Sequence, residues 1–292
     1  MIVPQQVVTE SLHEIIDQKR RWPLGVDIGW SPRKRSMAVA SIVDVFTPFD
    51  VRPVVVSADP GHRLFAWEAK SAIVCKWASK LPRELRALAV VAVDGPIGPE
   101  GRPTIQRYVD RTCQSGLCHR RCPPASVTGG GQKLVQATYA FLEKLCEGLE
   151  IGQLFKPQPK LPGVACILEV NPTVGLAWLV KSVDNPMQLP ARKRLIEWNG
   201  RRFKQKSDYY WAVGANRFVA DALRYAEVER VQHHERESSL YALAVALCMV
   251  RGELSKLYAI GKLTGRDGGV YHMLGPIHES WRNEYLRIGL QP

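Results

Sequence analysis

The stretch Gly25-Val26-Asp27-Ile28-Gly29-Trp30 decides the fold, because it is a short apolar run that stops at a carboxylate. Two later stretches have the same form, Val91-Ala92-Val93-Asp94-Gly95-Pro96-Ile97-Gly98 and Ile167-Leu168-Glu169-Val170-Asn171-Pro172. Runs of β-branched residues are typical of buried strands, and ligands bind where the strands of an open sheet end. We therefore expect Asp27, Asp94 and Glu169 to meet in one acidic site.

The segments around these stretches predict an α/β fold, a mixed sheet with helices packed on it. Three strands joined by short turns, 24–30, 37–45 and 51–57, predict an antiparallel meander. A wholly apolar strand over 88–94 is expected beside parallel neighbours, and a further strand is expected over 164–170. The remaining pattern predicts helices over 7–20, 63–80, 105–112, 132–149, 173–181, 207–231 and 238–258, and a closing strand or hairpin over 263–274.

The length of the chain fits one elaborated domain or two small ones. Its 292 residues are 46% hydrophobic, which is enough to bury a large core. We expect residues 1–23 to form an N-terminal helical extension and residues 24–292 to form the domain. A Cys- and Arg-rich loop over 95–131 and a basic, aromatic, helical insertion over about 182–236 are expected to interrupt it.

The charge balance and the cysteines indicate the kind of partner and the compartment. The chain has 40 Lys plus Arg against 28 Asp plus Glu, a net charge of +12, which favours nucleic acid as a partner, with solvated basic faces as the alternative. Seven irregularly spaced cysteines indicate reduced thiols. The first residues lack the apolar core of a signal peptide, and no stretch approaches the roughly 20 apolar residues of a membrane span. We expect a cytoplasmic protein with no membrane partner.

The order of the elements resembles the ribonuclease H-like fold. More closely, residues 24–277 resemble the domain-of-unknown-function 429 family, whose members are predicted nucleases of that superfamily. The residues that carry the resemblance are Gly25-Val26-Asp27 with Trp30, then Asp94-Gly95-Pro96-Ile97-Gly98, Glu169-Val170-Asn171-Pro172 and the closing Gly265-Arg266-Asp267-Gly268-Gly269-Val270. The resemblance implies a metal-dependent nuclease or phosphodiesterase that acts on DNA or RNA.

Phosphodiester hydrolysis explains why such carboxylates gather. Two divalent metals about 3.5–4 Å apart can activate a water and neutralise the leaving oxygen. Hard cations such as Mg²⁺ or Mn²⁺ require oxygen ligands, which Asp27, Asp94 and Glu169 would supply from neighbouring strand ends. Taken singly, each residue is more often a turn former or a helix cap, and it is the ordered set of three that favours the metal site.

The fourth acidic position departs from the family pattern. The last helix of the family opens with an acidic residue followed by Ala-Leu, and here Tyr241 precedes Ala242-Leu243. Glu237, one turn earlier on roughly the same face, is the candidate substitute and fourth catalytic residue. The alternative is that Glu237 is a first-turn charge that favours the helix dipole.

The departure at Tyr241 leaves two further functions open. One is a nucleic-acid-binding protein with a degenerate active site. The other is a phosphotransferase of the actin and sugar-kinase superfamily, whose first strand also carries Asp-x-Gly, as Asp27-Ile28-Gly29 does here.

Basic side chains in three segments are expected to bind nucleic acid, including single strands. Cations neutralise phosphates and aromatic faces stack on unpaired bases, although a solvated basic face would have the same composition. The candidate residues are Arg33, Lys34, Arg35, Arg107, Arg111, Arg120, Arg121, Arg192, Lys193, Arg194, Arg201, Arg202 and Lys204.

A cluster of soft ligands lies in the 95–131 loop. Cys113, Cys118, His119 and Cys122 have the residue types of a structural Zn²⁺ site. Their spacing is irregular and no second ligand pair lies farther along the chain, so buried free thiols with a surface histidine are the alternative.

Overall fold

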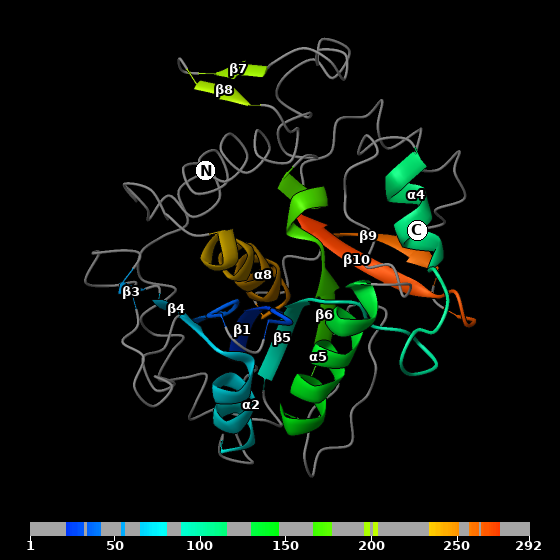
Figure 1. Ribbon diagram of the computed structural model, residues 1–292. Coiled ribbons are helices and arrows are strands. Elements are labelled where there is room, and N and C mark those ends of the chain that lie inside the picture. Colours follow the sequence, from blue (N-terminus) through cyan, green and yellow to red (C-terminus); the bar gives the residue numbers. More distant parts are fainter. Residues whose placement is uncertain are drawn as a thin grey trace.

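The centre of the protein is a six-stranded sheet with the strand order β3-β4-β2-β1-β5-β6 (Figure 1). The computed structural model describes residues 22–31, 34–41, 54–55, 65–80, 89–115, 130–145, 166–176, 196–198, 201–203, 234–250, 257–262 and 264–274. Within these ranges, no helix has the length and the apolar character needed to cross a membrane.

The sheet is mixed, with β1 (Trp22–Asp27) between an antiparallel and a parallel half. On one side β1 pairs with β2 (Met37–Ser41), β2 with β4 (Phe65–Ala69) and β4 with β3 (Val54–Val55), all antiparallel. On the other side β5 (Ala89–Asp94) and β6 (Cys166–Val170) continue the sheet in parallel. The mixed sheet predicted from the sequence is confirmed at this level.

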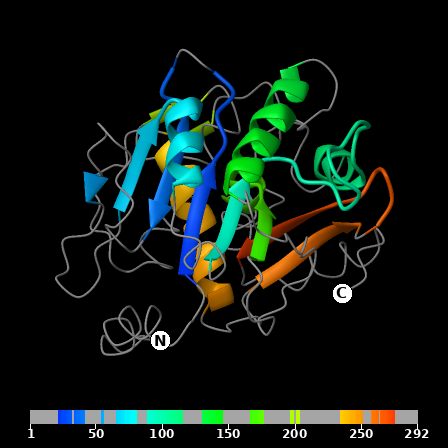
Figure 2. The same ribbon diagram turned by 90° about the horizontal axis from the view of Figure 1, so that it is seen from below.

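Helices cover both faces of the sheet. Figure 2 shows α2 (Ser71–Ser79) and α5 (Gly130–Leu145) in front of the strands and α8 (His234–Val250) behind them. The front core includes Val91, Val93 and Phe141, with Trp67 and Trp77 in edge-to-face contact at a centroid distance of 5.8 Å. Each fully buried aliphatic side chain of this kind contributes about 1.5–3 kcal/mol to folding.

The helix α8 is buried from Ser238 to Leu247, as its sequence requires. Every residue from Leu240 to Leu247 is buried, and a helix that is apolar all round must lie inside a protein. The helix crosses β1 at Gly25, where a Cβ atom would overlap the Ser239 carbonyl oxygen and the Leu243 backbone nitrogen. Glycine at this position therefore allows the helix backbone to rest directly on the strand.

Four further elements lie around the sheet. The helix α4 (Tyr108–Ser115) contacts the antiparallel hairpin of β9 (Leu257–Lys262) and β10 (Gly269–Leu274), and β10 lies beside β6. A helical turn over 172–176 follows β6. A second hairpin pairs β7 (Ile196–Trp198) with β8 (Arg201–Phe203).

Three predictions about these elements need correction. The segment 63–80 was expected to be helical throughout, but Phe65–Ala69 forms the strand β4. The strand β4 pairs with β2, where the predicted meander had placed the strand 51–57, and β3 pairs with β4 instead. The last helix ends at Val250, and Leu257 begins β9. Six residues of the expected helical insertion form the β7–β8 hairpin. Residues 22–23 of the expected N-terminal extension belong to β1, and residues 234–236 of the expected insertion belong to α8. Residues 1–21 and the other residues of the insertion lie outside the described residues.

Candidate acidic site at the strand ends

Asp27 and Asp94 lie side by side as the last residues of β1 and β5. These strands are parallel and in register, with Asp27 opposite Asp94, and the Ile28 amide donates a hydrogen bond to the Asp94 carbonyl oxygen at 3.2 Å. Parallel in-register partners point to the same face of a sheet. The predicted meeting of these two carboxylates is therefore found in the structure.

The two carboxyl groups share a hydrogen bond, and Asp27 is buried while Asp94 is partly buried. Asp27 is 8% exposed, and burial raises the pKa of Asp94 to about 7, while the hydrogen bond with Asp27 acts in the opposite direction. Burial penalises the ionised form of Asp94, and two adjacent carboxylates cannot both ionise at low cost. The pair therefore either keeps a proton near neutral pH or would be stabilised by a bound cation in place of that proton.

Glu169 lies on the opposite face of the sheet from this pair. Asp94 follows Ala92 and Val90, which pack against α8, whereas Glu169 follows Ile167, which packs with the α2 and α5 core. The register confirms the alternation, because Glu169 is the partner of Val93 and not of Asp94. The structure thus brings Asp27 and Asp94 together, as predicted, and places Glu169 on the other face of the sheet.

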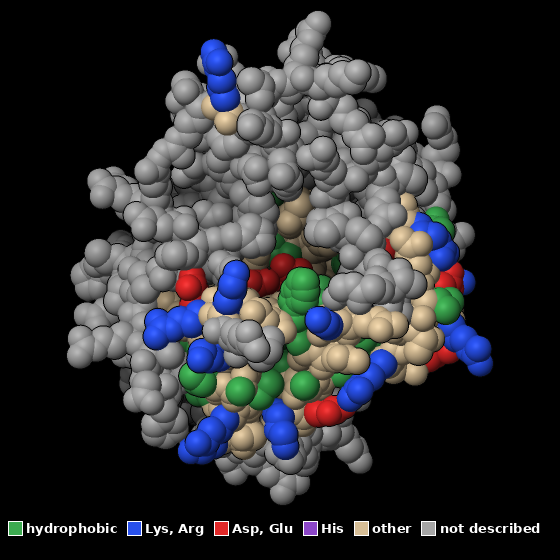
Figure 3. Space-filling model, in the orientation of Figure 1, with side chains coloured by type: hydrophobic (Ala, Val, Ile, Leu, Met, Phe, Trp, Pro, Cys, Tyr) green, Lys and Arg blue, Asp and Glu red, His purple; other side chains and the backbone are tan. Residues whose placement is uncertain are grey.

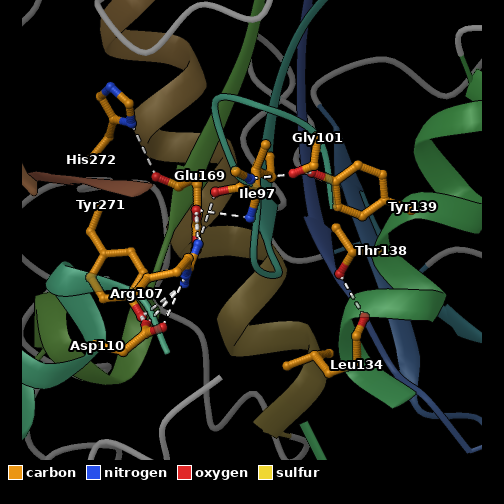
Figure 4. A network of polar contacts seen from close by, with 11 residues as sticks. Ile97, Gly101, Arg107, Asp110, Leu134, Thr138, Tyr139, Glu169, Tyr271 and His272 are labelled. Carbon is orange, nitrogen blue, oxygen red and sulfur yellow. Dashed lines mark hydrogen bonds and ion pairs between the residues drawn. The ribbon is translucent and has the colours of Figure 1, made fainter. Parts of the chain in front are cut away.

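Glu169 is bound instead by a buried arginine (Figure 4). Its Oε2 accepts hydrogen bonds from Arg107 Nη1 at 2.6 Å and from the Ile97 amide at 3.0 Å. Arg107 also donates from Nε and Nη2 to the two oxygens of Asp110, both at 2.9 Å. Burial raises the pKa of Glu169 to about 7, although the charge of Arg107 acts to lower it.

A carboxylate that sequence reasoning missed lies in the same row as the acidic pair. Glu68 on β4 is the register partner of Ala38, and Ala38 is the partner of Asp27. Register partners share a face, so Glu68 projects toward the same side as Asp27, with only the small Ala38 between their strands. The segment around Glu68 had been predicted as helix, which hid this alignment.

The chemistry of the pair fits a hard cation. Two adjacent carboxylates supply oxygen ligands, and a bound cation would offset the cost of ionising Asp94. The described residues contain no group of three or more His, Cys, Asp or Glu side chains close enough to hold a metal. We therefore assign the candidate cation site to Asp27 and Asp94 rather than to the predicted set of three.

The loop that follows Asp27, between β1 and β2, carries an exposed aromatic ring and two cations. Trp30 is 48% exposed, and Lys34 and Arg35 are exposed. The loop is closed tightly at its base, because a Cβ at Gly29 would overlap the Ser36 carbonyl group. Figure 3 shows acidic side chains in a recess near the centre of one face, with a hydrophobic side chain and basic side chains near its rim.

The other predicted phosphate contacts have mixed outcomes. Arg107 is fully buried and bound to carboxylates, so the prediction that it contacts nucleic acid is wrong. Arg111 is exposed and pairs with Asp267 at 3.1 Å, and Arg202 is exposed on β8. The side chain of Arg201 and the residues Arg33, Arg120, Arg121, Arg192, Lys193, Arg194 and Lys204 lie outside what the structure describes.

Tyr241 occupies the core rather than the acidic site. It is fully buried, and its hydroxyl accepts a hydrogen bond from the Leu274 amide at 3.2 Å and lies against Gly175. Its hydroxyl therefore connects β10 to the helical turn over 172–176. Glu237 lies in the first turn of α8, and its side chain is outside the described residues.

The predicted zinc ligands stay a prediction. Cys113 lies on α4, but its side chain is not described, and Cys118, His119 and Cys122 fall outside the described residues.

Comparisons with protein families, with curated proteins and with solved structures find no match to this chain. The site must therefore be interpreted from its own geometry.

Proposed function

We propose that the protein is a metal-dependent nuclease or related phosphodiesterase with a ribonuclease H-like fold, related to the domain-of-unknown-function 429 family. The adjacent carboxyl groups of Asp27 and Asp94, at the ends of two parallel in-register strands, are the observation that carries the proposal.

The strand arrangement supports this fold assignment. The first strand is central, its antiparallel neighbour is the next strand along the chain, and β5 and β6 extend the sheet in parallel on the other side. This is the arrangement expected of the ribonuclease H-like fold, with β4 as the third antiparallel strand.

Each residue near the pair has a role that follows from its chemistry. Asp27 and Asp94 are the residues that would hold Mg²⁺ or Mn²⁺, and the bound cation would polarise a phosphate oxygen and lower the pKa of a water. Lys34 and Arg35 would neutralise neighbouring phosphates, while Trp30 offers a flat face to an unpaired base. In the cation-free protein, Asp94 can take up or release a proton near neutral pH.

The proposal is tested by cation binding and by cleavage. We expect Mn²⁺ titration calorimetry at pH 7.5 to detect binding to the wild type, and labelled oligonucleotides to be cleaved with Mg²⁺ or Mn²⁺. Asp27→Asn and Asp94→Asn should each lower Mn²⁺ affinity by at least about tenfold and abolish cleavage.

Asp267→Asn is the matched control, because Asp267 lies on the β9–β10 hairpin and pairs with Lys262 and Arg111. It should leave both readouts unchanged. Unchanged Mn²⁺ affinity in both Asp27→Asn and Asp94→Asn would refute the proposal. Salt-sensitive binding of oligonucleotides with no cleavage under either cation would favour a binding protein instead.

A further inference from the structure

The loop over 95–101 that follows Asp94 is fixed by side chains from three other parts of the chain (Figure 4). The Ile97 amide donates to Glu169 Oε2 at 3.0 Å, and the Ile97 carbonyl accepts from Arg107 Nη1 at 2.9 Å. The Gly98 amide donates to the Tyr139 hydroxyl at 3.2 Å, which in turn donates to the Gly101 carbonyl at 2.6 Å. Both polar groups of the Ile97 residue are therefore held by the Glu169–Arg107 ion pair.

Arg107 is itself immobilised in this arrangement. Its five N–H groups reach Asp110 twice, the Ile97 carbonyl, Glu169 and the Tyr271 hydroxyl, the last at 3.4 Å. Its guanidinium carbon also lies 5.6 Å from the centre of the Tyr271 ring. A guanidinium has five donors in a rigid plane, so every donor is used and the group has one orientation.

Such a network fixes the positions of the groups it binds more than it raises the free energy of unfolding. Removing these charges from water is costly, and well-packed apolar residues are often at least as stabilising. What the network supplies is a fixed position for the Ile97 peptide groups, three residues after Asp94. Asp94 in turn is joined to β1 through its carbonyl oxygen, which accepts from the Ile28 amide.

We propose that Glu169 and Arg107 are positioning residues, which hold the loop after Asp94 and thereby keep the Asp94 carboxyl group beside Asp27. The inference rests on the proposed function, since it concerns the same site. It assigns Glu169 a different role from metal ligation, and it assigns Arg107 a role inside the protein rather than on a nucleic acid.

Two substitutions of Glu169 separate positioning from ligation. Glu169→Gln keeps an oxygen that can accept from Ile97 and Arg107, whereas Glu169→Leu removes it. Glu143→Leu is the matched control, because Glu143 is an exposed α5 residue that pairs with Arg102. The readout is hydrogen exchange of the Ile28 amide, which reports whether Asp94 stays in register with β1 and needs no metal.

We expect Glu169→Leu to speed exchange at the Ile28 and Ile97 amides by about tenfold or more, while the β2–β4 amides stay unchanged. Glu169→Gln and Glu143→Leu should change the Ile28 rate less than about threefold. Mn²⁺ affinity should follow the same order, with a loss of about tenfold or more in Glu169→Leu alone.

Three results would overturn the inference. The first is an unchanged Ile28 rate in Glu169→Leu. The second is an equal acceleration of all amides, including those of β2 and β4, because that would be general destabilisation. The third is an equal loss of Mn²⁺ affinity in Glu169→Gln and Glu169→Leu, as expected if Glu169 were a metal ligand. If the wild type binds no Mn²⁺, the proposed function fails and the exchange rates still decide the positioning role.

Discussion

Asp94→Asn should stabilise the protein while it removes the candidate cation site. The ordinary pKa of an aspartate is 3.8, and burial raises that of Asp94 to about 7 in the folded protein. Between these two values the folded state binds more protons than the unfolded state, so this group makes the free energy of unfolding fall as pH rises. Its contribution is fully present below pH 4 and is lost as pH rises through about 7.

The magnitude follows from the size of the shift. A displacement of about three pKa units corresponds to about 4 kcal/mol as an upper limit. The Asp94 side chain is partly exposed, so solvent screening reduces this to about 2 kcal/mol. An asparagine cannot ionise and avoids that cost. We therefore expect Asp94→Asn to raise Tm by about 4–8 °C at pH 8 and by little at pH 4.

Thermal denaturation followed by circular dichroism in a chelating buffer measures both values. Asp267→Asn is an informative control, because Lys262 and Arg111 lower the pKa of Asp267, so its ionised form stabilises the fold. That variant should lose stability at pH 8, the opposite sign. Mn²⁺ added without the chelator should raise Tm in the wild type and in Asp267→Asn, but not in Asp94→Asn. The reasoning fails if Asp94→Asn is less stable than the wild type at pH 8, or if the difference is the same at both pH values.

Three further substitutions test the packing and the surroundings of the pair. Gly25→Ala places a methyl group against the α8 backbone, and urea denaturation should show a loss of about 3 kcal/mol or more; a neutral result would contradict the close crossing of α8 and β1. Glu68→Gln should weaken Mn²⁺ binding several-fold by calorimetry, with Tm unchanged. An unchanged affinity would show that the Glu68 charge does not act on a cation bound at Asp27 and Asp94. Trp30→Ala should change stability by less than about 0.5 kcal/mol, since the side chain is exposed. The free energy with which this variant binds a single-stranded oligonucleotide, measured by fluorescence anisotropy, should be weaker by about 1–3 kcal/mol. An unchanged affinity would exclude stacking of a base on Trp30.

The sequence predicted the acidic pair because its signal is local. The β-branched runs before Asp27 and Asp94 specify buried strands, and parallel register then sets the two carboxyl groups side by side. Both residues end their strands. Glu169 is the last residue but one of β6, so the period of two turns it toward the other face. Counting from the end of the apolar run at Val170 would have revealed this difference.

Other features depend on contacts between distant segments. Arg107 and Asp110 are three residues apart and could be paired from the sequence, but Glu169 and Tyr271 reach them only through the fold. Phe65–Ala69 is apolar at nearly every position, and such a short run does not distinguish a strand from a buried helix. Its identity comes from pairing with β2 and β3.

The contact of α8 with Gly25 also bears on how the chain acquires its structure. The helix that completes the rear core belongs to the last fifth of the chain, and it rests on a strand made roughly 200 residues earlier, so loop closure over that distance is slow. During synthesis, Val90, Ala92, Leu168 and Val170 remain without their partner until α8 emerges. A nascent chain of this kind exposes an apolar sheet face for seconds at ordinary elongation rates, and exposed surface of this kind is prone to aggregate.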